Sequence, residues 1–139
     1  MKATDIPFVS HIGIEEAKNS TLSLDVNDKV LNHIQSIHAS AQFALAETQS
    51  GVHLQRLFPH LEGTVLPLLR DAAIKYKKPA IAKIVAEAST DEKAVEKFKA
   101  QFERKGRGTL QVDVIVTDIH GVVTSEATFT WFVQALNER

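Results

Sequence analysis

One long run of small and apolar residues constrains the fold of this chain more than any other feature. Residues 39–58, ASAQFALAETQSGVHLQRLF, are typical of a helix that stops at Pro59, because proline cannot continue a helix. From Ala39 to Ala46 the residues are small or apolar on almost every side, as expected for a helix that is buried all round. Such a helix requires a second layer of secondary structure to cover it.

Most of the remaining chain shows the two-residue period of β-strands. Alternating apolar residues and turn signals predict strands at 11–17, 21–27, 65–76, 80–89, 109–118 and 122–134. The period is clearest in the last two, and the short connection that contains Gly121 predicts an antiparallel hairpin between them. Residues 1–10 are interpreted as a lead-in or short helix that Pro7 and Phe8 pack against the rest of the chain.

A second, amphipathic helix is predicted between the strands 80–89 and 109–118. Thr90 can cap its N-terminus, acidic residues suit its first turn, and Gly106 can end it. Its apolar stripe is narrow, with Val95 and Phe98 as members, which indicates a helix on the surface.

These elements together predict an α+β fold. Strands with one apolar face need a partner layer, and only the helix at 39–58 is apolar enough to supply it. We therefore expect an antiparallel sheet that curls around one long central helix. The length of 139 residues suits a single domain, 1–139.

Composition excludes several classes of function. A formal net charge of −1 gives no reason to expect a nucleic-acid or membrane-surface partner. The chain has no cysteine, and its six histidines are scattered without the spacing of metal ligands, so neither a disulfide nor a metal site is expected. The chain shows neither the apolar core of a signal peptide nor a membrane span, so we expect a soluble, cytoplasmic protein.

One carboxylate interrupts the otherwise small and apolar helix. Glu47 lies in this helix, and Asn32 and His38 precede it, in the pattern N-x5-H-A-x7-E. The pattern resembles the hotdog-fold thioesterases of the phenylacetate-degradation type, and among them a poorly characterised branch. The resemblance extends over nearly the whole chain, through PFVSHIGIE, NHIQSIHASAQFALAETQSG, IKYKKPAIAKI and the two closing strands. It implies a hotdog fold and an enzyme that hydrolyses acyl-CoA or related thioesters.

The resemblance also implies roles for four residues. The acyl-CoA thioesterases of this group carry Asn, His, Gly and an acidic residue where this chain has Asn32, His38, Ala39 and Glu47. Asn32 and the Ala39 backbone N–H would polarise the thioester carbonyl, since the free amides of a helix N-terminus stabilise an oxyanion. His38 would shape this site, and Glu47 would act as general base or nucleophile. The methyl group of Ala39 narrows the approach to the N–H that glycine would leave open.

The helix geometry separates these groups within one subunit. Glu47 follows Ala39 by eight residues, which places it about 12 Å further along the helix axis. One thioester carbonyl cannot easily meet both, so the carboxylate is expected from a second subunit of a homodimer or homotetramer. Burial at that interface would raise the pKa of Glu47, as suits a base that works near neutral pH.

Other residues of the site are expected from the resemblance. Lys77, Lys78, Lys105 and Arg107 fall where related thioesterases hold coenzyme A, and their charges could meet its phosphates. Coenzyme A would enter as part of the substrate, and no cofactor is expected. Related enzymes hold the catalytic water with a hydroxyl residue at the position of Leu69. This chain departs from that pattern, because leucine has no hydroxyl.

Two other functions remain open at this stage. A non-catalytic acyl-CoA-binding protein is favoured by Ala39 and Leu69. A hotdog dehydratase would use His33 and Glu47, which are fourteen residues apart, although the Pro- and Gly-rich segment of such enzymes is missing between them. The sequence leaves open the acyl group, the choice between coenzyme A and an acyl-carrier protein, and the number of subunits.

Overall fold

A computed structural model describes residues 2–136 of the chain. Within them, six strands form one antiparallel sheet in the order β1-β2-β4-β5-β6-β3. The strands are β1 (Ile14–Glu16), β2 (Leu22–Leu24), β3 (Val65–Tyr76), β4 (Ile84–Ser89), β5 (Arg107–Asp118) and β6 (Val123–Ala135). The helical elements are η1 (Ala3–Asp5), α1 (Pro7–Ile12), α2 (Ala39–Leu57), η2 (Pro59–Leu61) and α3 (Glu92–Lys105).

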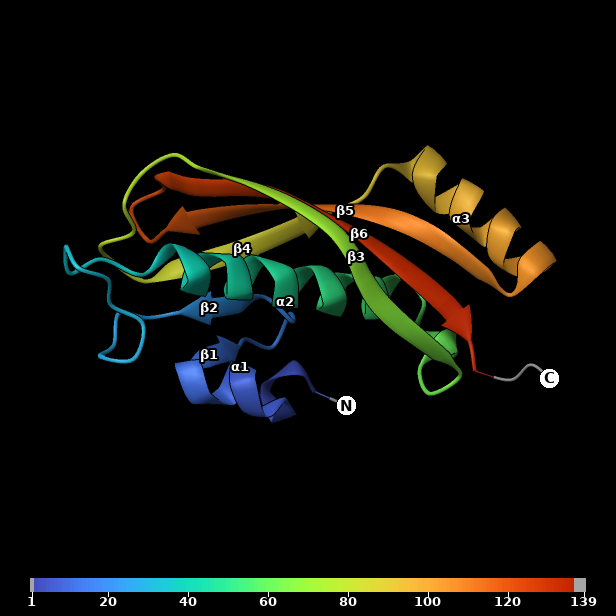
Figure 1. Cartoon of the computed structure of the whole chain (residues 1–139), viewed down its shortest axis with the longest axis horizontal. Coiled ribbons are helices and arrows are strands. Elements are labelled where there is room, and N and C mark those ends of the chain that lie inside the picture. Colours follow the sequence, from blue (N-terminus) through green and yellow to red (C-terminus); the bar gives the residue numbers. More distant parts are fainter. Residues whose placement is uncertain (1, 137–139) are drawn as a thin grey trace.

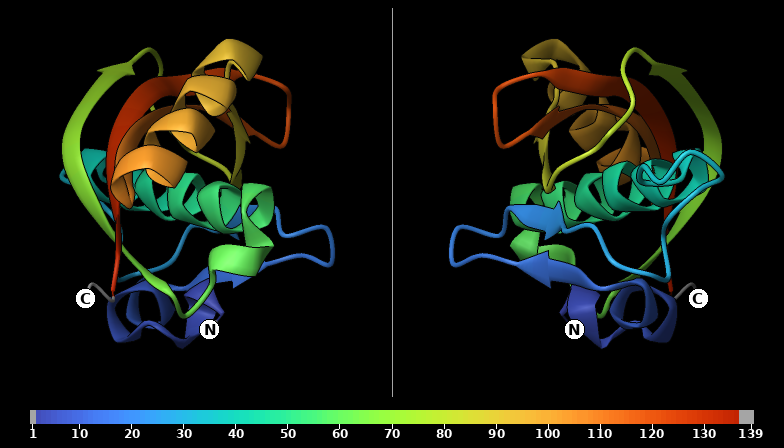
Figure 2. Two further views of the ribbon diagram at one scale, coloured as in Figure 1. Left: turned by 90° about the vertical axis from the view of Figure 1, so that its right-hand side faces the viewer. Right: turned by 90° about the vertical axis from the view of Figure 1, so that its left-hand side faces the viewer.

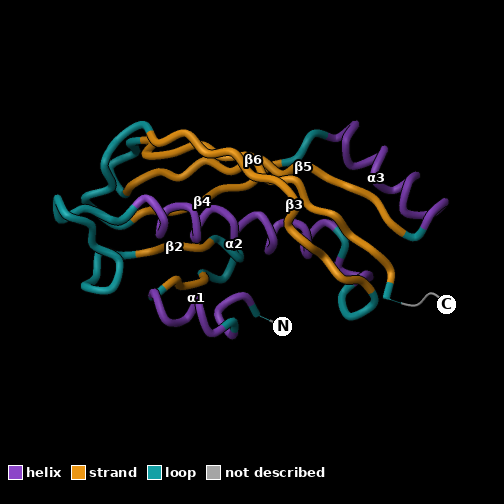
Figure 3. Tube along the Cα trace, viewed as in Figure 1, coloured by secondary structure: helices purple, strands orange, loops and turns teal. Residues whose placement is uncertain are grey.

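The sheet curls around α2, as the sequence predicts (Figures 1 and 2). Helix α2 spans 19 residues, and most of its side chains are buried on every side of the helix. Figure 3 shows β3, β5 and β6 crossing one side of α2 as long strands, while the short strands β1 and β2 lie on its other side. The α+β architecture with one central helix is therefore confirmed.

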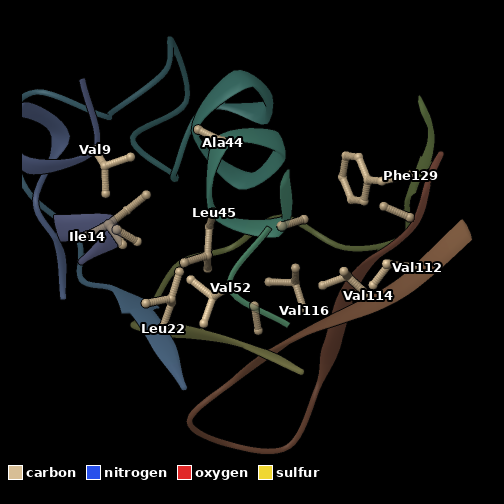
Figure 4. Packing of buried hydrophobic residues seen from close by; sticks show 14 of the residues in the cluster. Val9, Ile14, Leu22, Ala44, Leu45, Val52, Val112, Val114, Val116 and Phe129 are labelled. Carbon is tan, nitrogen blue, oxygen red and sulfur yellow. The ribbon is translucent and has the colours of Figure 1, made fainter. Parts of the chain in front are cut away.

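The core lies between α2 and the inner face of the sheet (Figure 4). Strand β5 alternates between exposed and buried residues along most of its length, and Val112, Val114 and Val116 point inward. Leu45 on α2 is fully buried, and the ring of Phe43 packs edge-on against Phe129 at 5.5 Å between centroids. Since each large apolar side chain contributes about 1.5–3 kcal/mol when buried, this layer supplies much of the stability.

The N-terminal segment is more helical than its sequence pattern predicts. Helix α1 continues through His11 to Ile12, and Gly13 ends it with a φ of 94°, so the strand expected at 11–17 is shortened to Ile14–Glu16. The expectation that Phe8 packs against the chain is wrong, because its side chain is 60% exposed. The strand expected at 21–27 likewise shortens to Leu22–Leu24.

Two further boundaries differ from the expectation. Asp91, not Thr90, caps α3, and its carboxylate accepts a hydrogen bond from the Ala94 N–H at 3.0 Å. The strand expected from residue 80 begins at Ile84. The backbone oxygen of Ala80 instead accepts a hydrogen bond from the Ile37 N–H at 2.8 Å, which ties this loop to the segment before α2.

Helix α3 closes the core at the C-terminal end of α2. Its Phe98 is almost fully buried and lies 5.0 Å from the Phe58 ring, measured between centroids. Gly108, in β5, allows this approach, because a Cβ at that position would lie 3.0 Å from the Phe98 ring. The glycine is therefore required by packing.

We expect Gly108→Ala to lower the free energy of unfolding by about 1–3 kcal/mol, because the added methyl group overpacks against Phe98. Urea denaturation followed by circular dichroism measures the change. Gly51→Ala is the matched control, since a Cβ there meets only Trp131 at an ordinary 3.4 Å and alanine favours the helix. Equal stability of wild type and Gly108→Ala would contradict the packing argument.

Candidate functional site

The N-terminus of α2 is exposed and capped by His38. The Nδ1 atom of His38 accepts a hydrogen bond from the Ser40 N–H at 3.0 Å. Ala39 is the first residue of the helix, and its backbone oxygen accepts a hydrogen bond from the Tyr76 hydroxyl at 2.9 Å. Partial burial raises the pKa of Tyr76, which keeps this hydroxyl protonated and donating. The end of β3 thus lies against the start of α2, where the helix amides face outward.

Asn32 organises the loop that leads into α2. Its Oδ1 accepts hydrogen bonds from the backbone N–H groups of Ile34 and Ser36, at 3.0 and 2.9 Å. Its Nδ2 donates to the Ser36 hydroxyl at 2.8 Å. A side-chain amide has two N–H donors, so one donor of Asn32 is left beyond this bond. These bonds therefore fix the orientation of the Asn32 amide within the loop that precedes α2.

Glu47 lies in a groove on another part of the same subunit. The groove has a volume of about 340 Å³ and runs between the N-terminal helical segment, α2 and the inner face of β3 and β6. Phe8, Val52, Pro67 and Trp131 are among its lining residues, so the surroundings of the Glu47 carboxylate are largely apolar. Burial raises the pKa of Glu47 above the ordinary value of 4.5, because the charged form loses solvation.

Trp131 and Ser50 hold the helix turn that carries Glu47. The indole N–H of Trp131 donates to the Ser50 hydroxyl at 2.8 Å, and that hydroxyl donates to the backbone oxygen of Glu47 at 2.6 Å. Trp131 is one of the buried residues that alternate along β6, but no sequence signal links it to Glu47. Leu69 pairs with Trp131 across β3 and β6, so the position expected to hold a hydroxyl lies near this groove.

The structure does not bring the four expected catalytic residues together within one subunit. Glu47 follows the helix start by eight residues, or about 12 Å, in agreement with the spacing argument. Neither His33 nor His38 lines the Glu47 groove, and both side chains are exposed. Within one subunit, Glu47 and the start of α2 therefore lie in separate parts of the molecule.

The two pairs of basic residues lie at opposite ends of the sheet. The backbone N–H groups of Lys77 and Lys78 bond to the Thr124 oxygen, just beyond the end of β3 that meets the start of α2. Lys105 and Arg107 flank the turn between α3 and β5 at the far end. The pairing of Tyr76 with Ser125 and of Arg107 with Gln134 puts nine residues of β6, about 30 Å, between the pairs.

Across residues 2–136, no group of three or more His, Asp and Glu side chains is arranged to hold a metal ion. No helix in the same range is long and apolar enough to cross a membrane.

Comparison with known proteins places the chain in a family. Residues 4–133 match the family described as a domain of unknown function, DUF4442, and the chain belongs to this family. No significant match was found among curated proteins.

Solved structures show the fold. PA5026 from Pseudomonas aeruginosa, described as a protein of unknown function and probable thioesterase, has a TM-score of 0.82 at 22% identity, covering 96% of this chain and 91% of its own. The thioesterase HI1161 from Haemophilus influenzae has a TM-score of 0.78 at 18% identity. The match covers 98% of this chain and 88% of HI1161. BH2602 from Bacillus halodurans, solved with CoA, has a TM-score of 0.71 at 22% identity. The match covers 91% of this chain and 74% of BH2602.

These similarities identify the architecture as the hotdog fold, as the sequence resemblance implies. At identities of 18–22%, these structures show the fold of this chain and not its activity. The phenylacetate-degradation subtype stays a prediction.

Glu47→Gln is expected to stabilise the protein at neutral pH. A carboxyl whose pKa is raised by folding favours the folded state when protonated, and this advantage is lost as pH rises through the folded pKa. The neutral amide of the variant loses no stability as pH rises. The melting temperature of Glu47→Gln should therefore exceed that of wild type by an amount that grows above pH 4.5, the ordinary pKa of the carboxyl, and vanishes below it. Thermal melts across pH measure it, with Glu103→Gln on the exposed face of α3 as control. A pH-independent difference would contradict the burial of the Glu47 charge.

Proposed function

We propose that this protein hydrolyses acyl-CoA, or a related thioester, at a site formed across a dimer interface. The observation that carries the proposal is the half-buried Glu47 carboxylate, with its raised pKa, in an apolar groove of a hotdog fold. A carboxylate in such surroundings suits general-base chemistry near neutral pH. The thioesterase descriptions of PA5026 and HI1161 support the same reaction class.

The reaction needs an oxyanion donor and a base. The N–H of Ala39, at the exposed start of α2, polarises the thioester carbonyl, and the remaining donor of Asn32 assists. Glu47 of the other subunit removes a proton from water as the water oxygen bonds to the carbonyl carbon. The C–S bond then breaks, and the thiolate takes up the proton from Glu47. His38 contributes by capping the helix and fixing the direction of its first amides.

The free edge of the sheet supports the dimer. Strand β3 ends the strand order, so one of its edges has no neighbour within the described chain. Leu66 and Leu68 on this strand are each 47% exposed. A long apolar edge strand is a hazard unless another chain covers it, and pairing with a second β3 would also bring the two helices near each other. This arrangement offers the partner subunit's Ala39 to Glu47.

Coenzyme A is the proposed carrier. Lys77 and Lys78 lie beside the start of α2, where the carbonyl would be polarised, and their ammonium groups can bind phosphates. Lys77 also forms a 3.6 Å ion pair with Glu126, which holds it at this end of the sheet. The CoA in BH2602 supports the choice. Lys105 and Arg107 are too distant to assist within the same subunit.

A non-catalytic acyl-CoA-binding protein is the second candidate, and the groove chemistry favours it on one point. Leu69 offers no hydroxyl to hold a water. Thr48, the hydroxyl residue next to Glu47, donates its proton to the Ala44 backbone oxygen at 2.6 Å. The dehydratase reading gains no such support, since His33 lies in the exposed loop before α2 and not in the Glu47 groove.

Thiol release from acyl-CoAs tests the proposal. Wild type should hydrolyse at least one substrate in a panel of short, long and aromatic acyl-CoAs. Glu47→Ala should lower kcat by about 100-fold or more while the protein stays folded and oligomeric, because the general base is lost. Saturable binding without release by wild type would instead favour the binding protein. Turnover that survives Glu47→Ala would exclude this residue as the base.

Mixing two inactive variants tests the shared site. Ala39→Pro removes the proposed oxyanion N–H, and proline fits the first helical position because His38 already has the extended ψ of 142° that a following proline requires. Ala39→Gly, which keeps the N–H, is the control. Random mixing of Ala39→Pro and Glu47→Ala subunits should restore about a quarter of wild-type activity, since half of the dimers then contain one intact site. Activity that stays at the level of the separate variants would place the site within one subunit.

A further inference from the structure

A second apolar hollow continues from the Glu47 groove. Its volume is about 310 Å³, and it lies at the C-terminal end of α2, beside η2 and the start of β3. Leu54, Gln55 and Pro67 line both hollows, so the two hollows adjoin at these residues. The proposed catalytic carboxylate is in the first hollow, and an apolar wall that includes Phe58 and Leu61 is in the second.

One face of α2 forms the floor of both hollows. Glu47, Gly51, Leu54, Gln55 and Phe58 follow one another at intervals that keep them on the same side of a helix. From Glu47 to Phe58 this floor advances about 16 Å at 1.5 Å per residue. Between them, Gly51 faces the ring of Trp131, which a Cβ at this position would meet at 3.4 Å.

The far hollow is apolar and ends against packed rings. Its lining includes Phe58, Leu61, Val65 and Val133, and behind Phe58 lies the buried ring of Phe98. Gln55 and Glu62 are the polar side chains of the lining, and both are exposed. Such a wall accepts a hydrocarbon and offers few hydrogen bonds to a polar substituent.

We propose that these adjoining hollows bind the acyl tail of the substrate, and that the preferred tail is a straight aliphatic chain of about ten to fourteen carbons. An extended hydrocarbon advances about 1.25 Å per carbon, from its bond lengths and angles, so about thirteen carbons span the floor from Glu47 to Phe58. A phenylacetyl group would occupy only the first part. The inference rests on the proposed function and adds the substrate class to it.

The direction of binding follows from the same layout. The carbonyl lies at Glu47, and the tail runs toward the C-terminus of α2 in the subunit that supplies Glu47. The coenzyme A part then leaves toward the α2 start of the other subunit, where the basic residues after β3 lie. Each subunit thereby holds the tail of one substrate and the carrier of the other.

Gln55→Trp tests the tail site. Gln55 is exposed and lines the junction of the two hollows, so an indole there closes the passage without entering the core. Arg56→Trp is the matched control, because the neighbouring side chain is also exposed and lines a different, polar hollow with His53 and Glu87. Both variants place the same bulky residue on the same turn of α2.

The readout is kcat/KM for butanoyl-, octanoyl-, dodecanoyl- and phenylacetyl-CoA. In wild type, kcat/KM should rise by about fourfold for each methylene until the tail reaches Phe58, from the transfer free energy of a CH₂ group. Gln55→Trp should lower kcat/KM for dodecanoyl-CoA by about fifteenfold to sixtyfold, as two or three methylenes are excluded, and leave that for butanoyl-CoA unchanged. Arg56→Trp should change neither. A wild-type preference for short or phenylacetyl groups, or an equal loss for both chain lengths in Gln55→Trp, would overturn the inference.

Binding of non-hydrolysable thioethers separates this inference from the proposed function. If no acyl-CoA is hydrolysed, calorimetry with dodecyl-CoA and butyl-CoA still decides the tail site. Tighter binding of dodecyl-CoA that Gln55→Trp abolishes would uphold the tail site and reject hydrolysis. Equal affinity for the two thioethers would overturn the tail site itself.

Discussion

The packing of α2 against the curled sheet is the interaction on which the rest of the structure depends. Helix α2 buries apolar side chains such as Leu45 and Val52, and the sheet has one apolar face, so each supplies the surface that the other buries. Leu45 from the helix and Val112 and Val114 from β5 meet in this layer (Figure 4). Helix α3 and the N-terminal segment then close the two openings that remain.

The same packing creates the chemical asymmetry of the proposed site. At its start, α2 emerges from the sheet and exposes its free amides beside the end of β3. In its middle it carries Glu47 into an apolar groove, where the bond from Trp131 to Ser50 fixes the turn. Further on it floors a hydrocarbon-lined hollow. In the proposed function, a single helix thus presents a polarising end, a base and a binding surface in order, and the proposed dimer combines them.

Much of the fold follows from the sequence because its signals are local and periodic. The long strands, α2 and the hairpin before β6 were predicted near their observed positions. The short elements were less predictable: Gly13 ends a helix inside an expected strand, and Asp91 rather than Thr90 caps α3, since neighbouring polar residues compete for the same backbone N–H groups. The exposure of the Phe8 side chain depends on which distant segments pack against it, and a local sequence pattern does not predict that.

The sequence by itself determined the long elements, the buried helix and the eight-residue separation of Ala39 from Glu47, because periodicity and helix rise are properties of the chain alone. Only the tertiary structure decided that Trp131 and Pro67 line the Glu47 groove, that Lys77 lies near the helix start while Arg107 lies far from it, and that a second hollow extends the groove. These relations join segments distant in sequence, and they depend on strand order, register and the curl of the sheet.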